Sequence, residues 1–437
     1  MPKGMRYGYQ FGFFNAINFQ IAAGTPLILF AKELGASSTV LGIVAAILPL
    51  FTFLQLLSAG YLPRFGYRRF MLAGWGLRTL MVFALSVVPL LGFADAATKM
   101  ALVLVLLVLF SILRGISVGV WMPWITELLP AEKRGVYLSG EQLAVHAGSL
   151  AALGICAVTL QFLPNPARYS AIFFLSALAG LTSLFALKKM PDAPASEVTR
   201  NSSQPVPWKA ILDFLPFRKL LLFSSLWAIC TNSLGIFTVA FTRETLRFEE
   251  SNIVYLSLFL FIGALVTLPF TARFLQAVGM KGVLRFAMGI TGCVILGWML
   301  LAAGFGREQG WLVAALNLGL GVAYGNFAVA NASLAMAVMP AMGRNHFFAL
   351  YTVITSLLAA LSPIFFGMLL DAMGGLNKKI GLWEINRYSL YFLTSLILLA
   401  IAGLTISLLK THEIGELNRR DFTILASLRR FGRILQR

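Results

Sequence analysis

Apolar runs of about 20 residues recur along the whole chain, and this pattern most strongly limits the folds it can adopt. A helix rises 1.5 Å per residue, so about 20 apolar residues cross the ~30 Å hydrocarbon core of a bilayer. The 437 residues are 59% hydrophobic and only 12% charged, whereas soluble domains are roughly 25% charged. The sequence therefore predicts an all-α polytopic membrane protein.

The runs predict twelve transmembrane helices in two six-helix bundles. Between the sixth and seventh runs, Pro191, Pro194, Pro205 and Pro207 lie among Lys, Ser and Asn residues, which indicates a cytoplasmic linker. The predicted division is 1–187 for the first bundle, 188–217 for the linker, 218–410 for the second bundle and 411–437 for a tail. The expected spans lie near 8–31, 39–61, 70–92, 100–126, 138–162, 169–187, 219–242, 252–272, 282–304, 311–337, 346–370 and 388–409.

A short internal repeat favours two related halves. Segments 129–134 and 339–344 each contain a proline and end in arginine, at an offset of 210 residues. Segments 63–65 and 272–274 both contain Arg-Phe, at an offset of 209 residues. Repeated halves are a common architecture of membrane transporters.

The net charge of +18 would suggest a nucleic-acid partner in a soluble protein, but its distribution here predicts topology instead. Most Lys and Arg residues fall on the side of the spans that carries both termini, as the positive-inside rule requires of a cytoplasmic side. We therefore expect both termini in the cytoplasm, contact with anionic lipid, and no nucleic-acid partner. The expected location is a plasma membrane, such as the inner membrane of a bacterium.

The tail, residues 411–437, differs in kind from the spans. Leu, Ile and Phe recur in it every three to five residues between arginines, which predicts an amphipathic helix on the inner leaflet. The alternative is a basic tail without regular structure. The three cysteines, Cys156, Cys230 and Cys293, lie in predicted spans and have neither metal-ligand nor disulfide spacing.

Two basic turns carry a resemblance to a known family. The turn after the second span contains Gly60, Leu62, Arg64, Gly66, Arg68 and Arg69, similar to the signature G-x-L-x-D-R-x-G-R-[KR], with Pro63 near the place of its acidic residue. The turn after the fourth span contains Glu127, Pro130, Arg134 and Gly135, similar to E-x-x-P-x-x-x-R-G. With its two six-span halves, nearly the whole chain resembles the major facilitator superfamily.

The resemblance implies that the two halves rock about a central site lined by spans one, four, seven and ten. Polar residues at mid-depth gather on those same spans, and buried polar groups need partners or water. The residues expected to bind substrate are Asn15, Asn18, Gln20, Arg114, Trp121, Asn232, Tyr324 and Asn326. Five residues are expected to act as gate or loop contacts: Arg64, Arg68, Glu127, Arg134 and Arg344.

Structural alternatives stand beside these roles. The asparagines could hydrogen-bond one helix to another, and Trp121 and Tyr324 could be core packing in a chain that is 13% aromatic. Arg78 is interpreted as structural, whereas Arg114 is interpreted as lining a cavity, because no acidic residue lies at its depth in the same half.

Proton coupling requires a titratable group in the pathway, and the interiors of spans one and seven contain none. Glu141 and His146, near the inner end of the fifth span, are the candidates for coupling to H⁺. A positive cavity without a central acid favours an anionic solute. No cofactor and no metal are expected.

The sequence thus predicts a monomeric secondary transporter of a small organic solute, with H⁺ or another ion as coupling partner. It is not expected to be an enzyme, since it has no H-E-x-x-H motif and no catalytic carboxylate cluster. Two alternatives remain open: a receptor or scaffold that does not transport, and a multidrug-type exporter of amphipathic compounds.

Overall fold

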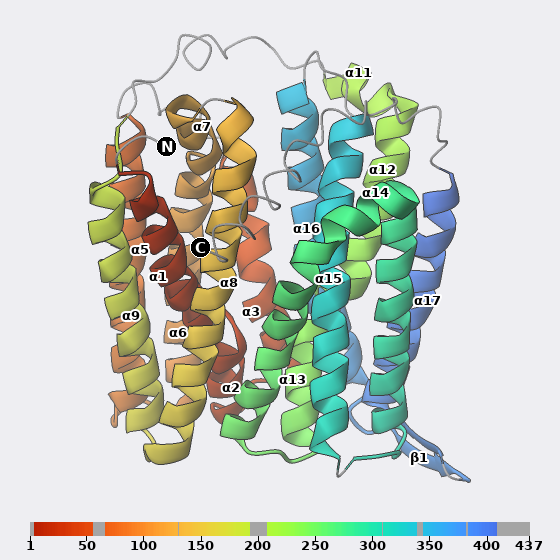
Figure 1. Ribbon diagram of the computed structural model, residues 1–437. Helices are drawn as coiled ribbons and strands as arrows, with labels where there is room; N and C mark the ends of the chain where they lie inside the picture. Colours follow the sequence, from red (N-terminus) through yellow and green to blue (C-terminus); the bar gives the residue numbers. More distant parts are fainter. Residues whose placement is uncertain are drawn as a thin grey trace, which may run out of the picture. The chain divides into compact units, whose positions relative to one another are not determined.

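The computed structural model describes residues 4–55, 66–129, 131–192, 208–307, 309–338, 344–381 and 383–408. These residues are almost entirely helical, with one two-stranded hairpin near the end (Figure 1). Eleven described segments are long and apolar enough to cross a membrane, and a shorter apolar helix covers Ser38–Leu54. Each of the twelve predicted spans overlaps one of these segments, which confirms the predicted fold class.

Two of the spans are each made of two α-helices, and a third is followed by a short α-helix. α1 (Arg6–Ala23) and α2 (Thr25–Glu33) meet at Gly24, and α6 (Ala96–Val118) is followed directly by α7 (Trp121–Leu128). α12 (Leu215–Thr231) and α13 (Leu234–Glu244) meet at Asn232 and Ser233. Broken helices in transporters often mark the site where a substrate binds.

The long helix α14 (Glu250–Ala302) contains two spans joined at Gly279. Gly279 has a φ of 73°, a conformation that glycine adopts without steric cost. The other elements are α3 (Ser38–Leu50), η1 (Phe51–Leu54), α5 (Tyr67–Val87), η2 (Val88–Leu90), α8 (Ala131–Phe162), α9 (Ala167–Lys188), α11 (Trp208–Asp213), α15 (Gly310–Val338), α16 (Arg344–Ala372), β1 (Asn377–Ile380), β2 (Trp383–Asn386) and α17 (Arg387–Ser407).

By its internal contacts the chain divides into two compact units. Unit 1 comprises residues 1–26, 51–206 and 417–437, and unit 2 comprises 27–50 and 207–416. The predicted boundaries 1–187 and 218–410 stay a prediction; the grouping by contacts differs from them over 27–50. The predicted tail, 411–437, lies outside the described residues.

Glycines allow the helices of unit 1 to approach closely. α1 packs against α8 and α9, and α5 packs against α6 and α9. A Cβ added at Gly8 would overlap the hydroxyl of Tyr137, and one at Gly148 on α8 would overlap the carbonyl oxygen of Phe13 on α1. A Cβ at Gly12 would make an ordinary van der Waals contact, 3.5 Å from Cγ of Glu141. Small residues four apart on one helix face are a frequent solution for close packing in membranes. The aromatic core beside them includes Phe11, Tyr67, Trp75, Trp124 and Tyr137.

Unit 2 uses the same device at two helix pairs. α14 packs against α15, where a Cβ at Gly321 would overlap the backbone of Leu260. α3 packs against α16, where a Cβ at Gly367 would overlap the carbonyl oxygen of Ser38. α17 packs against α12 and α14 around the rings of Phe241, Trp298 and Phe392.

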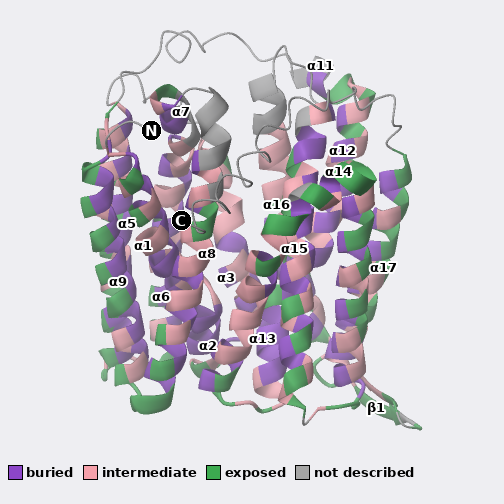
Figure 2. Cartoon of the chain, viewed as in Figure 1, coloured by how far each residue is buried: buried purple, intermediate pink, exposed green. Residues whose placement is uncertain are grey.

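The outer faces of the helices are apolar, as a bilayer requires. Buried and exposed residues alternate along α9 and α17 (Figure 2). The exposed positions of α9 include Phe174, Leu178 and Phe185, and those of α17 include Ile397 and Leu404. Large apolar side chains exposed along so many helices fit contact with lipid rather than water.

Candidate functional site

Arg114 is a cation inside the α6 span with no polar protein partner in the described part of the chain. Its side chain is half-buried, and its Cζ atom lies 5.1 Å from the ring centre of Phe19 on α1. Neither a hydrogen bond nor an ion pair joins it to any described residue. An arginine within a span costs about 2.5–3.5 kcal/mol on insertion scales, so its charge must be met by water or a bound group.

Arg78 on α5 is the opposite case, because it is almost fully buried and well surrounded. Its Nη2 donates to Oδ1 of Asn15 and, over 3.3 Å, to Oδ1 of Asn18. Its Cζ lies 4.7 Å from the ring centre of Trp75 and 5.0 Å from that of Phe110, within the range of cation–π attraction. These contacts support the structural interpretation of Arg78.

The two arginines are neighbours. Phe110, which contacts Arg78, lies one helical turn before Arg114 on α6. The two positive charges are close enough to repel each other. No described carboxylate lies close enough to offset either charge. The interior of unit 1 is therefore electropositive at this depth.

Of the three polar residues predicted on α1, two serve Arg78 and the neighbouring helices. Asn15 also accepts a hydrogen bond from Nε1 of Trp75 at 2.9 Å. Asn18 is fully buried and donates to the carbonyl oxygen of Ser176 on α9 at 2.9 Å. Gln20 is half-buried and folds back toward Gly24, where an added Cβ would lie 2.8 Å from its Nε2.

Glu141 is a buried acid between α8 and α1. It is 8% exposed, packs against Gly12, and accepts a hydrogen bond from Trp121. The ring of Trp121 lies 5.0 Å from that of Phe11, and the rings of Tyr9 and Tyr137 stack at 5.0 Å beside Glu141. No described cation neutralises this carboxylate, so its charge would be costly in this apolar setting.

The three polar residues predicted to bind substrate in unit 2 differ in their exposure and in their hydrogen bonds to other helices. Asn232, at the break between α12 and α13, is exposed and donates to the carbonyl oxygen of Ala359 at 2.6 Å. Tyr324 donates to the carbonyl oxygen of Thr231 at 3.0 Å. Asn326 is 2% exposed and links α15 to α14 through the hydroxyls of Thr267 and Thr271. Asn232 is therefore the most accessible of the three.

Two groups on these helices were not predicted. The rings of Trp227 and Phe327 stack at 3.7 Å between α12 and α15. Asn331 bonds to Ser224 on α12 at 3.1 Å and to Tyr351 on α16 at 2.7 Å. Asn331 follows Tyr324 by seven residues, which is two helical turns, and this periodicity could have identified it.

Charge is distributed unequally between the helices that the resemblance places at the cavity. α6 carries Arg114, whereas α15 contains no Asp, Glu, Lys or Arg. The span formed by α12 and α13 contains no such residue between Lys219 and Arg243. These helices of unit 2 offer amide, hydroxyl and aromatic groups instead.

The predicted gate and loop residues and His146 are only partly covered by the described residues. His146 is half-buried on α8, and Glu127 is exposed at the end of α7. Arg68 reaches Asp192 at 3.4 Å. Arg64, and the side chains of Arg134 and Arg344, lie outside the described residues. Within the described part, no group of three or more His, Cys, Asp or Glu residues could hold a metal.

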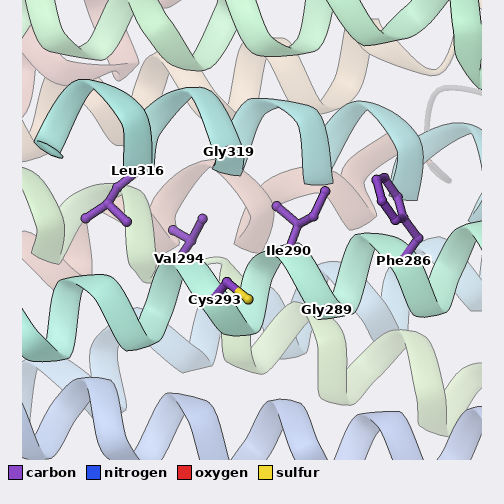
Figure 3. Close-up of a pocket in the computed structure, with 7 residues that line it drawn as sticks. All are labelled: Phe286, Gly289, Ile290, Cys293, Val294, Leu316 and Gly319. Carbon is purple, nitrogen blue, oxygen red and sulfur yellow. The ribbon is translucent and has the colours of Figure 1, made fainter. Parts of the chain in front are cut away.

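One apolar groove of about 480 Å³ opens between the second half of α14 and α15 (Figure 3). Its lining residues are Phe286, Gly289, Ile290, Cys293, Val294, Leu316 and Gly319. None of them is charged, and only the Cys293 thiol is more polar than a hydrocarbon. The groove therefore lacks the groups that would orient a polar solute.

Residues 11–363 match the family described as Major Facilitator Superfamily. No curated protein matches the sequence. Three solved structures share the fold over most of their length. They are a D-xylose-proton symporter (15% identity, 93% of this chain and 96% of that one, TM-score 0.73), the nucleoside transporter NupG (12%, 93% and 99%, 0.68) and a bacterial homologue of the iron transporter ferroportin in an inward-facing state (15%, 93% and 97%, 0.67).

Proposed function

Because the chain belongs to the major facilitator superfamily, we propose that it is a secondary transporter of a small organic anion. Membership makes it an integral membrane protein with a transporter fold rather than an enzyme, and alternating access is the mechanism that this fold serves. The proposal adds the charge of the substrate and the residues that bind it.

The guanidinium of Arg114, which has no polar partner among the described residues, carries this proposal. This charged side chain lies within the membrane-spanning helix and needs a group that offsets its charge. Among the described residues, only the ring of Phe19 contacts it. Arg78 cannot share an acid with it, because it is buried among Asn15, Asn18 and two aromatic rings. A carboxylate or phosphate group of a solute would form two parallel hydrogen bonds with Arg114 and neutralise it.

The helices of unit 2 support an organic rather than an inorganic anion. Asn232 has an exposed amide whose Oδ1 accepts no hydrogen bond from the described residues. Trp227 and Phe327 add aromatic surface on the same helices. Amide and aromatic groups of this kind suit the uncharged parts of an organic solute.

Glu141 is the proposed proton-coupling residue, with His146 as the second candidate. Its carboxylate lies buried on α8 against α1, the helix that also carries the asparagines around Arg78. Binding and release of a proton there would change the charge of unit 1 by one. A proton moving with the anion would keep the transported charge small.

We further propose both termini in the cytoplasm, residence in a bacterial inner membrane, and a monomeric carrier. The positive-inside distribution of Lys and Arg supports the orientation. The multidrug-type exporter remains the second candidate, because aromatic surface such as Trp227 and Phe327 would also suit amphipathic compounds.

Counterflow of labelled solutes into proteoliposomes tests the proposal. We expect the wild type to exchange one or more small carboxylates or phosphate esters, and Arg114→Gln to abolish that exchange while the protein stays folded. Arg114→Lys should rescue poorly, because an ammonium cannot reproduce the two-pronged contact of a guanidinium. Arg168→Gln, at the start of α9 and outside the proposed site, is the matched control.

Each result of the counterflow assay distinguishes the proposed function from one alternative. Normal exchange by a stable Arg114→Gln variant would remove Arg114 as ligand and the anion proposal with it. Exchange of amphipathic cations or neutral drugs, but not anions, would favour the exporter. Absence of exchange for every class of solute would favour a receptor or scaffold.

A further inference from the structure

A cluster around one carboxylate joins three helices at one end of unit 2. Glu244, the last residue of α13, forms an ion pair with Lys32 of α2 and accepts a hydrogen bond from the hydroxyl of Tyr388 on α17. Nη2 of Arg387, the first residue of α17, lies 2.6 Å from the same carboxylate. The side chains of Lys32 and Glu244 are only 14% and 21% exposed, so water screens their attraction poorly.

Lys32 also fixes the turn between α2 and α3. Its Nζ donates to the carbonyl oxygen of Ala36 at 2.8 Å. The ion pair with Glu244 therefore holds both the end of α2 and the turn that leads into α3.

A second carboxylate holds the beginning of α3. Asp371, in the last turn of α16, accepts hydrogen bonds from the backbone N–H groups of Ser38 at 2.9 Å and Thr39 at 2.7 Å. These N–H groups lie in the first turn of α3, where they have no partner within the helix. A negative charge at a helix N-terminus is also favoured by the helix dipole.

We propose that Glu244 and Asp371 form a two-part latch that closes this end of the transporter. By the predicted division at residues 188–217, α2 and α3 belong to the first repeat and α13, α16 and α17 to the second, although α2 and α3 group with unit 2 by their contacts. Alternating access requires helices of the two repeats to separate at each end in turn. Opening at this end must break the Lys32–Glu244 pair and free the N–H groups of Ser38 and Thr39.

The contacts around Glu244 also explain how the latch can close again. Arg387 and Tyr388 lie in the second repeat together with Glu244, so these bonds persist when Lys32 leaves. They keep the carboxylate in place and neutralised until Lys32 returns. With both termini cytoplasmic, this is the extracytoplasmic end. The proposal requires an alternating carrier but no particular substrate.

A neighbouring ion pair provides the matched control. Arg307 and Glu384 lie 2.5 Å apart at the same end of unit 2, and β2, which contains Glu384, leads into α17. This pair involves neither α2 nor α3. Glu384→Gln therefore removes a comparable charge without touching the latch.

Cysteine accessibility measures the state of this end. Ala240 lies one turn before Glu244 on α13 and is 1% exposed, so Ala240→Cys reports whether the helices have separated. The reporter is placed in a background with Cys293→Ser, since the other two cysteines are buried. A membrane-impermeant maleimide is added to right-side-out and to inverted vesicles, and the labelling rate is compared among Glu244→Gln, Asp371→Asn, their double variant, Lys32→Ala and Glu384→Gln.

We expect Glu244→Gln, Asp371→Asn and Lys32→Ala each to accelerate labelling in right-side-out vesicles, the double variant by about tenfold, as loss of about 1.4 kcal/mol from the closed state would give. Glu384→Gln should label at the wild-type rate. Lys32→Ala tests the same ion pair should Glu244→Gln fail to fold. Wild-type rates in a folded double variant, equal acceleration by Glu384→Gln, or acceleration confined to inverted vesicles would each overturn the proposal.

Discussion

The contact between Arg78 and Asn18 is suited to a double-mutant cycle, because both residues are buried and Oδ1 of Asn18 accepts its described hydrogen bond from Arg78. Arg78→Met keeps an unbranched side chain of similar length but removes the donor to Oδ1 of Asn18, which accepts no other described hydrogen bond. Asn18→Leu keeps the size of the side chain but removes that acceptor and the donor to Ser176. Both variants should fold at reduced stability.

The magnitude follows from the contacts. An orphaned buried acceptor costs about 1–3 kcal/mol, and each lost cation–π contact of Arg78 about 0.5–2 kcal/mol. Removing the desolvated charge of Arg78 offsets part of this cost. We therefore expect each single variant to lower the free energy of unfolding by about 2 kcal/mol. The coupling between them should approach about 1.5 kcal/mol, the upper range for hydrogen bonds between membrane helices.

Equilibrium unfolding in mixed detergent micelles gives the four free energies of the cycle. The control cycle combines Arg78→Met with Thr159→Val, which removes a hydrogen bond within α8 that Arg78 does not share. A control coupling near zero is expected. If the Arg78–Asn18 coupling is also below about 0.5 kcal/mol, the two residues are energetically independent, and the inference that Asn18 stabilises Arg78 is refuted.

Three further predictions concern the ends of the helices. Reporter fusions at Thr199 and Arg437 should both report a cytoplasmic location and one at Asn165 the opposite side; different sides for Thr199 and Arg437 would refute the two-half topology. Deletion of residues after Thr411 should leave a folded, monodisperse membrane protein. If the monodisperse peak on size-exclusion chromatography disappears in this variant, the tail contributes to the stability of the helix bundle. Hydrogen bonds from Thr98 hold the pKa of Asp95, the N-cap of α6, below its ordinary value. The Asp95 carboxylate therefore stabilises the folded state at pH values above its ordinary pKa. This stabilisation is lost as the pH falls through the lower pKa of the folded state. Asp95→Ala should abolish this pH dependence of the melting temperature, and an unchanged profile would show that the cap contributes nothing.

The spans could be predicted from the sequence because hydrocarbon thickness fixes both their length and their composition. The breaks at Gly24 and at Asn232–Ser233 were not predicted. Gly24 is followed by Pro26, and Asn232 and Ser233 are polar, but the apolar residues on both sides make each span read as one continuous helix. The hairpin of β1 and β2 was not predicted either. It is closed by Gly381 at a φ of 61°, and its four-residue strands are too short to show a reliable alternation.

At the candidate site, sequence reasoning found the polar residues but could not pair them. The composition of α1 identified Asn15 and Asn18, and the sequence allowed either substrate binding or bonds between helices. Their bonds to Arg78 depend on how α1 and α5 pack, which no local pattern specifies. The same holds for Lys32 and Glu244, whose pairing depends on tertiary structure.

The unequal distribution of charge between α6 and the uncharged helices of unit 2 has an electrical consequence. Under the proposed function, an anion bound to Arg114 without a proton would cancel its charge, and the carrier loaded in this way would be closer to neutral than the empty one. Moving one elementary charge through 100 mV changes the free energy by about 2.3 kcal/mol. In that case a membrane potential would act mainly on the return of the empty carrier, and net uptake would depend on voltage more strongly than exchange between two loaded states. A proton carried on Glu141 together with a monovalent anion would instead give the loaded and empty carriers the same charge, so the voltage dependence of net uptake distinguishes the two cases.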